Sequence, residues 1–412
     1  MKSRKGNGSG RLPDVHAGFI PLVDCATLAI ARELGFDRRN GIALRLHRDV
    51  SWANIRDKVN VGALDCAHML APMPIASSLG VGHVRVPVIA PMSLGLNGNA
   101  ITVSRSLFTH MLDMDAENAR AGGMAAGKAL AKVVAERRQR GAEPLTLGMV
   151  YPFSCHNYEL RYWLAAAGID PDLDVQLVVI PPPLMADSLK AGQIHGFCVG
   201  EPWNSLAVEL GAGVIVATKT ELWRNSPEKV LGMRLSWAED NAETMIALVR
   251  ALVDAAIWLD IPGNRAEAAA ILSREEYLNL PVEILARSLT GTVLRGPGMR
   301  SLPDEGFFVF HDQDATVPHH SHAVWLVSQM IRWGQIAGDF NIASLASRVF
   351  REDLYRRAIP SEGQAPRAPT AIARSAFFGG ENFEPEKVLD YIRGFSIHSP
   401  ALDIKALEAA NS

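Results

Sequence analysis

His156 and Gly200 are the residues whose types and positions best suit ligand chemistry. Ser154 is a favoured helix N-cap, and the apolar residues that follow it recur at helical spacing. His156 therefore falls in the first turn of a predicted helix. Unpaired N–H groups and a partial positive charge make that position better suited to an anion than to a metal. Taken alone, such a histidine is more often a capping or packing residue.

Gly200 lies in the stretch GFCVGEPWN, which begins with a predicted buried strand. A glycine at the end of that strand lets the backbone approach a small ligand. Glu201 and Pro202 then open another helix. A strand end beside a helix start is a frequent place for a small ligand in α/β folds.

The search for catalytic or metal-binding patterns is negative. GxSxG, HExxH, P-loop and GxGxxG patterns are missing from any suitable context. Glu201 and Asp65 have no evident partner for acid–base work. His311, His319, His320 and His322 are the candidate zinc ligands, the last three in a DxxxxHHxH array. The array lacks regular zinc-ligand spacing and precedes an amphipathic helix, so a helix-entry segment is favoured. We expect a protein that is not an enzyme and that has no metal and no cofactor.

Composition narrows the class of protein. The chain has 412 residues, of which 48% are hydrophobic and 21% charged, and this is long enough for two globular domains. A net charge of -3 argues against direct nucleic-acid binding over the whole surface. The basic N-terminus lacks the apolar run of a secretory signal, and no stretch approaches a membrane span. We therefore expect a cytoplasmic protein without membrane contact, in which four scattered cysteines are free thiols.

Strand and helix patterns alternate over two regions. VHAGFIPLV, IALRLHR and ALDCAHML predict strands separated by helices, which favours a mostly parallel sheet covered on both faces. TLGMVY, VQLVVI and HGFCVG supply a second sheet, and Asn97-Gly98 turns the chain between the two. The resulting expectation is a flexible tail at 1–12, one lobe at 13–98 plus 236–360, a second lobe at 99–235, and an extended arm at 361–412.

Several motifs in order carry a family resemblance. They are SWANIRDKV, DCAHMLAPMP, LNGNAITVS, CHNYELRYWLAAAGIDPD, GFCVGEPWN and EKVLGMR, and the likeness covers about residues 15–355. The chain resembles NrtA/CmpA-like nitrate- and bicarbonate-binding proteins of ABC uptake systems, and cytoplasmic nitrate/nitrite sensors of the NasS type. The resemblance implies an α/β, two-lobed, periplasmic-binding-protein-like fold of type II, with a hinge between the lobes and the ligand between them.

The resemblance also implies a set of nitrate-binding residues. Nitrate is planar and singly charged, so its site needs several donors and no facing carboxylate. Asn99 stands where nitrate transporters usually carry glutamine, which is one methylene longer. Without the resemblance, the tryptophan of this set reads equally well as core packing, and the lysine as a solvated surface residue. The implied positions are Trp52, Asn99, His156, Gly200 and Lys229.

Two functions follow from the resemblance. The first is a cytoplasmic nitrate or nitrite sensor that, without ligand, sequesters an RNA-binding antiterminator, an ANTAR response regulator of the NasT type, and releases it when the anion binds. The alternative is the substrate-binding component of a nitrate or bicarbonate ABC transporter. An enzyme of the pyrimidine-precursor type on the same fold would need a catalytic cysteine or histidine set that the sequence does not offer.

Overall fold

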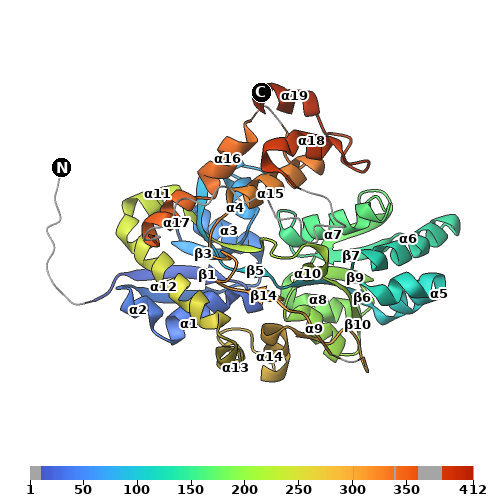
Figure 1. Ribbon diagram of the computed structural model, residues 1–412, viewed down its shortest axis with the longest axis horizontal. Coiled ribbons are helices and arrows are strands. Elements are labelled where there is room, and N and C mark those ends of the chain that lie inside the picture. Colours follow the sequence, from blue (N-terminus) through green and yellow to red (C-terminus); the bar gives the residue numbers. More distant parts are fainter. Residues whose placement is uncertain (1–10, 300, 338–339, 361–382, 412) are drawn as a thin grey trace.

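Two five-stranded sheets, each flanked by helices, lie side by side in the computed structural model (Figure 1), which describes residues 11–299, 301–337, 340–360 and 383–411. The first sheet has the order β2-β1-β3-β11-β4. Its strands are β1 (Asp14–Phe19), β2 (Ala43–Arg48), β3 (Cys66–Leu70), β4 (Val88–Ser93) and β11 (Lys229–Arg234). Strands β1, β2 and β3 pair in parallel, whereas β11 runs antiparallel to both β3 and β4. The sheet is therefore mixed: four of its strands run in the same direction, as the expectation of a mostly parallel sheet requires, and β11 runs against them.

Both faces of the first sheet are covered. On β11, Leu231 and Met233 pack with the core beneath α1 (Ala26–Glu33) and α12 (Ala242–Asp260), while Val230 points into the opposite core. Because side chains alternate between two covered faces, the middle of the strand, 230–233, carries no polar side chain, and the charged residues stand at its ends. The other helices around this sheet are α2 (Phe36–Arg39), α3 (Trp52–Asn60), α4 (Met73–Leu79), α11 (Leu235–Asp240), α16 (Ile342–Val349) and α17 (Glu352–Ala358).

The second sheet has the order β10-β6-β9-β7-β8. Its strands are β6 (Asn99–Ser104), β7 (Leu145–Met149), β8 (Val175–Val179), β9 (Gly196–Gly200) and β10 (Gly213–Thr218). Here β7 pairs in parallel with β8 and β9, and β6 pairs antiparallel with β9 and β10. Its helices are α5 (Arg105–Ala121), α6 (Gly123–Gln139), α7 (Cys155–Ala166), α8 (Met185–Lys190), α9 (Trp203–Glu209) and α10 (Lys219–Leu222).

The chain crosses between the sheets beside a short ribbon of β5 (Leu96–Asn97) and β14 (Phe308–Val309). Gly98 has a φ of 84°, and a Cβ there would lie 2.2 Å from the Phe308 ring, so this crossing requires a glycine. The chain returns through α10 into β11. Residues 229–234, which we expected in the second lobe, are thus hydrogen-bonded in the first sheet.

The C-terminal residues 383–411 are helical where an extended arm was expected. They form α18 (Val388–Arg393) and α19 (Ile404–Asn411), and Trp325 of α15 (His320–Arg332) donates to the Tyr391 hydroxyl at 3.1 Å. Residues 361–382 of the expected arm, and residues 1–10 of the expected tail, lie outside the described residues. The elements that follow α12 in the sequence and precede α15 include α13 (Arg265–Leu272), α14 (Val282–Thr290), β12 (Thr292–Val293) and β13 (Leu302–Pro303).

Three smaller expectations can also be compared with the structure. Helix α15 begins at His320, which confirms the histidine array as a helix entry. All four cysteines are free and buried, as expected. Within the described ranges, no helix combines the length and the hydropathy that a membrane crossing requires.

Candidate functional site

The five nominated residues lie at element ends that meet between the two sheets. Trp52 begins α3, Asn99 begins β6, His156 is in the first turn of α7, Gly200 ends β9 and Lys229 begins β11. All five are buried, and the Lys229 side chain is 1% exposed. The lysine is therefore not the solvated surface residue that its type alone suggests.

The residues just before His156 in the sequence fix its position. The Ser154 hydroxyl accepts a hydrogen bond from the Asn157 backbone N–H at 3.0 Å, which is the expected N-cap, and Ser154 Oγ donates to the Tyr151 carbonyl at 2.6 Å. The cap fixes where α7 starts, and so fixes His156 in its first turn.

Gly200 brings two of the other residues together. A Cβ built on Gly200 would lie 3.3 Å from Asn99 Oδ1 and 3.6 Å from His156 Nε2. Lys229 Nζ lies 5.6 Å from the centroid of the Trp52 ring. The two groups are joined by Glu228, whose Oε1 is 2.7 Å from Lys229 Nζ and 3.4 Å from His156 Nε2.

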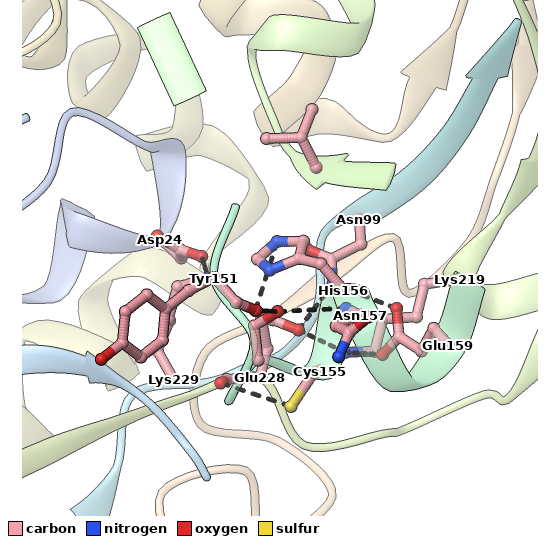
Figure 2. Close-up of polar contacts among 12 residues, drawn as sticks. Asp24, Asn99, Tyr151, Cys155, His156, Asn157, Glu159, Lys219, Glu228 and Lys229 are labelled. Carbon is pink, nitrogen blue, oxygen red and sulfur yellow. Dashed lines mark hydrogen bonds and ion pairs between the residues drawn. The ribbon is translucent and has the colours of Figure 1, made fainter. Parts of the chain in front are cut away.

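Five charged or titratable residues at the site were missed by sequence reasoning. Figure 2 labels four of them: Asp24, Glu159, Lys219 and Glu228. Lys229 Nζ contacts Asp24 Oδ2 at 2.6 Å, and the other carboxylate oxygen of Asp24 lies 2.8 Å from His68 Nε2. On the other side, Lys219 Nζ contacts Glu159 Oε1 at 2.6 Å and Glu228 Oε2 at 2.7 Å. Glu228 is therefore shared by both lysines, and the cluster consists of Asp24, His68, Glu159, Lys219 and Glu228 together with Lys229.

The carboxylates orient the Asn99 amide. Its Nδ2 donates to Glu228 Oε2 at 2.6 Å and to Glu159 Oε2 at 3.1 Å. Because an ionised carboxylate only accepts, the amide nitrogen must face Glu228 and the carbonyl oxygen must face Gly200. Asn99 thus presents its Oδ1 toward the site, where we expected an amide donor.

Cys155, Glu159 and Glu228 place potential metal-ligand atoms within 4.8 Å of one another. The Lys219 ammonium, however, contacts both carboxylates and also donates to the Pro227 carbonyl at 2.7 Å. A buried ammonium in that position supplies the positive charge that a metal ion would supply. The three residues are accordingly satisfied without a metal.

Several buried polar atoms at the site have no hydrogen-bond partner among the described residues. They are Trp52 Nε1, Asn99 Oδ1, His68 Nδ1 and both ring nitrogens of His156. A buried polar group without a partner is costly, and such groups are rare in native proteins. Their concentration beside Gly200 and Lys229 indicates a place for a small polar ligand.

Burial and charge set the protonation of these groups. Burial lowers the pKa of His156 to about 3, so the imidazole is neutral at pH 7. Burial raises the pKa of Glu159 to about 7, although Lys219 opposes the shift. Burial also acts to raise the pKa of Glu228, but its charged neighbours hold that pKa well below its usual range. Since His156 is neutral, we attribute this lowering to Lys219 and Lys229.

Comparisons with known proteins show the family to which the chain belongs. The model of the NMT1-like family matches residues 9–273. The nitrate/nitrite binding protein NrtA of Nostoc sp. PCC 7120 is 32% identical over 388 residues, which cover 92% of this chain and 85% of that protein. The chain belongs to the NMT1-like family. Family members of this kind are solute-binding proteins, so the expectation that the chain is not an enzyme is confirmed.

Two further relatives show how much of the chain is matched. The crystal structure of the periplasmic nitrate-binding protein NrtA from Synechocystis PCC 6803 superposes with a TM-score of 0.85 at 30% identity, covering 94% of this chain and 99% of that one. This confirms the expected type II periplasmic-binding-protein fold. The nitrate import ATP-binding protein NrtC of Synechocystis sp. is 36% identical over 95% of this chain, which spans only 56% of that relative.

Proposed function

We propose that the protein binds nitrate or nitrite between its two lobes, through Trp52, Asn99, His156, Gly200 and Lys229. The observation that carries the proposal is that buried nitrogen groups without hydrogen-bond partners, Trp52 Nε1 and the His156 ring, lie near the Lys229 ammonium. The names of the NrtA relatives, nitrate/nitrite binding proteins, point to the same ligand.

The chemistry of the site suits a small monovalent anion. Trp52 Nε1 is a donor without a competing acceptor, and neutral His156 offers one ring N–H. The Lys229 ammonium has three N–H groups, of which Asp24 and Glu228 engage two. The third is available to an anion near Trp52, and the absence of a side chain at Gly200 would let the backbone approach that anion.

The finer proposal is that of a cytoplasmic sensor. In the ligand-free form it would hold an RNA-binding antiterminator, an ANTAR regulator of the NasT type, and anion binding would release it to act on nitrate-assimilation genes. The support is the resemblance of the site motifs to NasS-type sensors, together with a ligand site built from both sheets. If the regulator binds the open clamp and the anion the closed one, linkage makes the two mutually antagonistic.

The second candidate is the substrate-binding component of a nitrate or bicarbonate ABC transporter. The likeness to import proteins favours it. Both candidates use the same anion site, so a partner experiment must separate them. Co-purification of the chain with an RNA-binding regulator encoded beside it, with and without millimolar nitrate, does so.

In that experiment the sensor proposal predicts a complex that nitrate dissociates. A Lys229→Ala receptor should keep its regulator even in nitrate, because it cannot bind the anion that favours closure. A complex indifferent to nitrate, or no complex, would remove the sensor function and leave the transporter component.

Calorimetry tests the ligand itself. Nitrate and nitrite should bind with micromolar dissociation constants, about 8 kcal/mol of binding free energy. Bicarbonate and sulfate should bind far more weakly. Bicarbonate binding as tight as nitrate binding would contradict the ligand assignment while leaving the site in place.

A further inference from the structure

A second hollow lies in the first lobe and contains none of the proposed anion-binding residues. It is a groove of about 820 Å³ between α4, α11, α16 and the start of α17. Helices α4, α16 and α17 all contact β4, the edge strand of the first sheet, and gather around it (Figure 1). Strand β11 begins at Lys229, whereas the groove is reached at Leu235, just after that strand ends. The length of a strand therefore separates the groove from the anion site.

Much of the groove is lined by apolar side chains. Leu79 and Leu235 are half-buried and Pro87 is exposed, and buried Ile89 and Phe350 also contribute to the lining. Contiguous apolar surface that is accessible from solvent is uncommon on a protein unless something binds to it. The lining therefore favours an occupant with apolar side chains.

The groove is open to solvent along part of its lining. Exposed lining residues come from the segment before β4, from α16 and from α17, and they are Arg85, Pro87, Ser347, Arg348 and Asp353. Small-molecule sites usually enclose about 70–90% of their ligand. An open groove instead suits a segment of a larger partner, which presents one face to the groove and keeps its other face outside.

The backbone at this edge of the sheet is already hydrogen-bonded. The Val88 N–H donates to Ser78 Oγ at 3.1 Å, and Ser78 Oγ donates to the Val88 carbonyl at 2.9 Å. The Ala90 carbonyl accepts from the Arg351 N–H at 3.0 Å. An added strand would have to displace these bonds. We therefore expect an occupant that binds through its side chains, as an amphipathic helix does in an apolar groove.

The two carboxylates that line the groove are each paired with an arginine. Asp353 accepts two hydrogen bonds from Arg351, at 2.7 and 2.6 Å, and Glu352 forms an ion pair with Arg356. A carboxylate that is held in this way adds little negative charge to the groove. The charge that the groove offers to a partner is thus set by its remaining arginines.

Arg85 and Arg348 are those arginines. Both are exposed, and neither forms an ion pair within the part of the chain that the structure describes. Arg85 Nε donates to the Ser78 carbonyl at 2.9 Å, so this side chain is oriented but not neutralised. A guanidinium binds a carboxylate in two-point contact, and an apolar groove beside two such groups is complementary to an apolar segment with acidic flanks.

We propose that this groove binds an acidic amphipathic helix of a partner protein. Apolar side chains at helical spacing contact the lining, and carboxylates on the flanks of the helix pair with Arg85 and Arg348. The inference goes beyond anion binding and does not depend on it, because no residue of the groove belongs to the proposed nitrate site.

Three synthetic peptides test the chemistry of the occupant on the full chain. The first is a fluorescently labelled helix of about 18 residues, with leucines at i, i+3, i+4 and i+7 and glutamates beside them. The second carries lysine for every glutamate, and the third carries serine for every leucine. Fluorescence anisotropy should show micromolar binding of the first peptide and at least about tenfold weaker binding of the other two. Failure of the first peptide to bind, or equal binding of the first two, would overturn the proposal.

Charge reversal locates the binding. Arg85→Glu/Arg348→Glu should weaken binding of the acidic peptide at least about tenfold and strengthen binding of the lysine peptide. The matched control is Arg105→Glu/Arg120→Glu, which reverses two exposed arginines of α5 in the second lobe that form no ion pair within the described ranges. The control should bind the acidic peptide like the parent. An equal loss in both variants would show attraction to net charge alone and overturn the groove.

Two further measurements separate the remaining outcomes. Nitrate calorimetry on the groove variant should match the parent, so a failed peptide test leaves the anion function standing. A dimer that sedimentation detects in the parent and not in the groove variant would make a second copy of the chain the occupant, and would overturn the proposal. Should the double variant be unstable, Arg348→Glu alone breaks no described side-chain bond and should still weaken the acidic peptide, by about threefold or more.

Discussion

Replacing Lys229 with methionine tests whether this lysine is the buried counter-ion on which the site depends. The change keeps the length and approximate volume of the side chain and removes its charge. Lys229 is 1% exposed, and its ammonium contacts Asp24 at 2.6 Å and Glu228 at 2.7 Å. After the substitution Asp24 retains only His68 as a side-chain partner among its described contacts, while Glu228 still has Lys219.

The expected loss of stability follows from the buried charge that the substitution leaves without a partner. Removing one partner of a buried ion pair typically costs about 3–5 kcal/mol, because the other charge stays buried and unpaired. Asp24 is 6% exposed and Glu228 2% exposed, so solvent offers little screening. We therefore expect Lys229→Met to lower the free energy of unfolding by roughly 3–5 kcal/mol, and to weaken nitrate binding by about 2–3 kcal/mol.

Urea unfolding at pH 7, followed by circular dichroism, measures the first quantity, and calorimetry measures the second. Lys58→Met is the matched control, because that lysine also contacts a carboxylate, Asp49 at 2.7 Å, but its own side chain is 48% exposed. An ion pair whose lysine is half-exposed should be worth about 1 kcal/mol or less. If both variants lost the same small amount, Lys229 would not be the buried counter-ion described here, and its assignment to the anion site would also fall.

Three other substitutions test separate parts of the structure. Ser154→Ala should lower the free energy of unfolding by about 1–2 kcal/mol, measured by urea unfolding, because it removes the N-cap of α7; an unchanged value would contradict the cap. Gly200→Ala should leave the thermal midpoint within a few degrees of the parent but weaken nitrate binding at least about tenfold. The reason is that the new Cβ would lie 3.3 Å from Asn99 Oδ1, in the proposed ligand space. Unchanged nitrate affinity in calorimetry would show that the anion does not bind beside Gly200. Burial raises the pKa of Glu201 to about 7, above the unfolded value, so this group costs stability increasingly as pH rises from about 4.5 to 7. Glu201→Gln should therefore gain roughly 2–3 kcal/mol relative to the parent at pH 8 and little at pH 4.5, and a pH-independent difference in urea unfolding would refute the shift.

Local signals predicted most of the elements around the site. The Ser154 cap, the helix after it and the strand that ends at Gly200 were all expected from the sequence and are present. Short-range periodicity and capping suffice for such elements because the interactions that define them are local. The antiparallel insertion of β11 between β3 and β4 was not expected, since strand order depends on contacts far apart in the chain.

The charged cluster escaped sequence reasoning for the same reason. Asp24 and Lys229 are 205 positions apart, and Asn99 and Glu228 are 129 positions apart. A weak signal existed: Lys219 follows the apolar strand run GVIVAT, and Glu228 directly precedes another buried strand. A charge beside a buried strand must find a partner, but the sequence does not say which one.

Carboxylates near an anion site were not expected, and their presence has a physical purpose. Glu228 and Asp24 hold the Lys229 ammonium in place, and Glu228 with Glu159 fixes the Asn99 amide. They also limit the positive charge that the site offers. The two lysines face three carboxylates, of which Glu159 has a pKa of about 7, so the site carries little net positive charge. The second charge of sulfate would therefore lie close to buried carboxylates without compensation. We therefore attribute the expected rejection of sulfate to the charge balance of the cluster as much as to the tetrahedral shape of that ion.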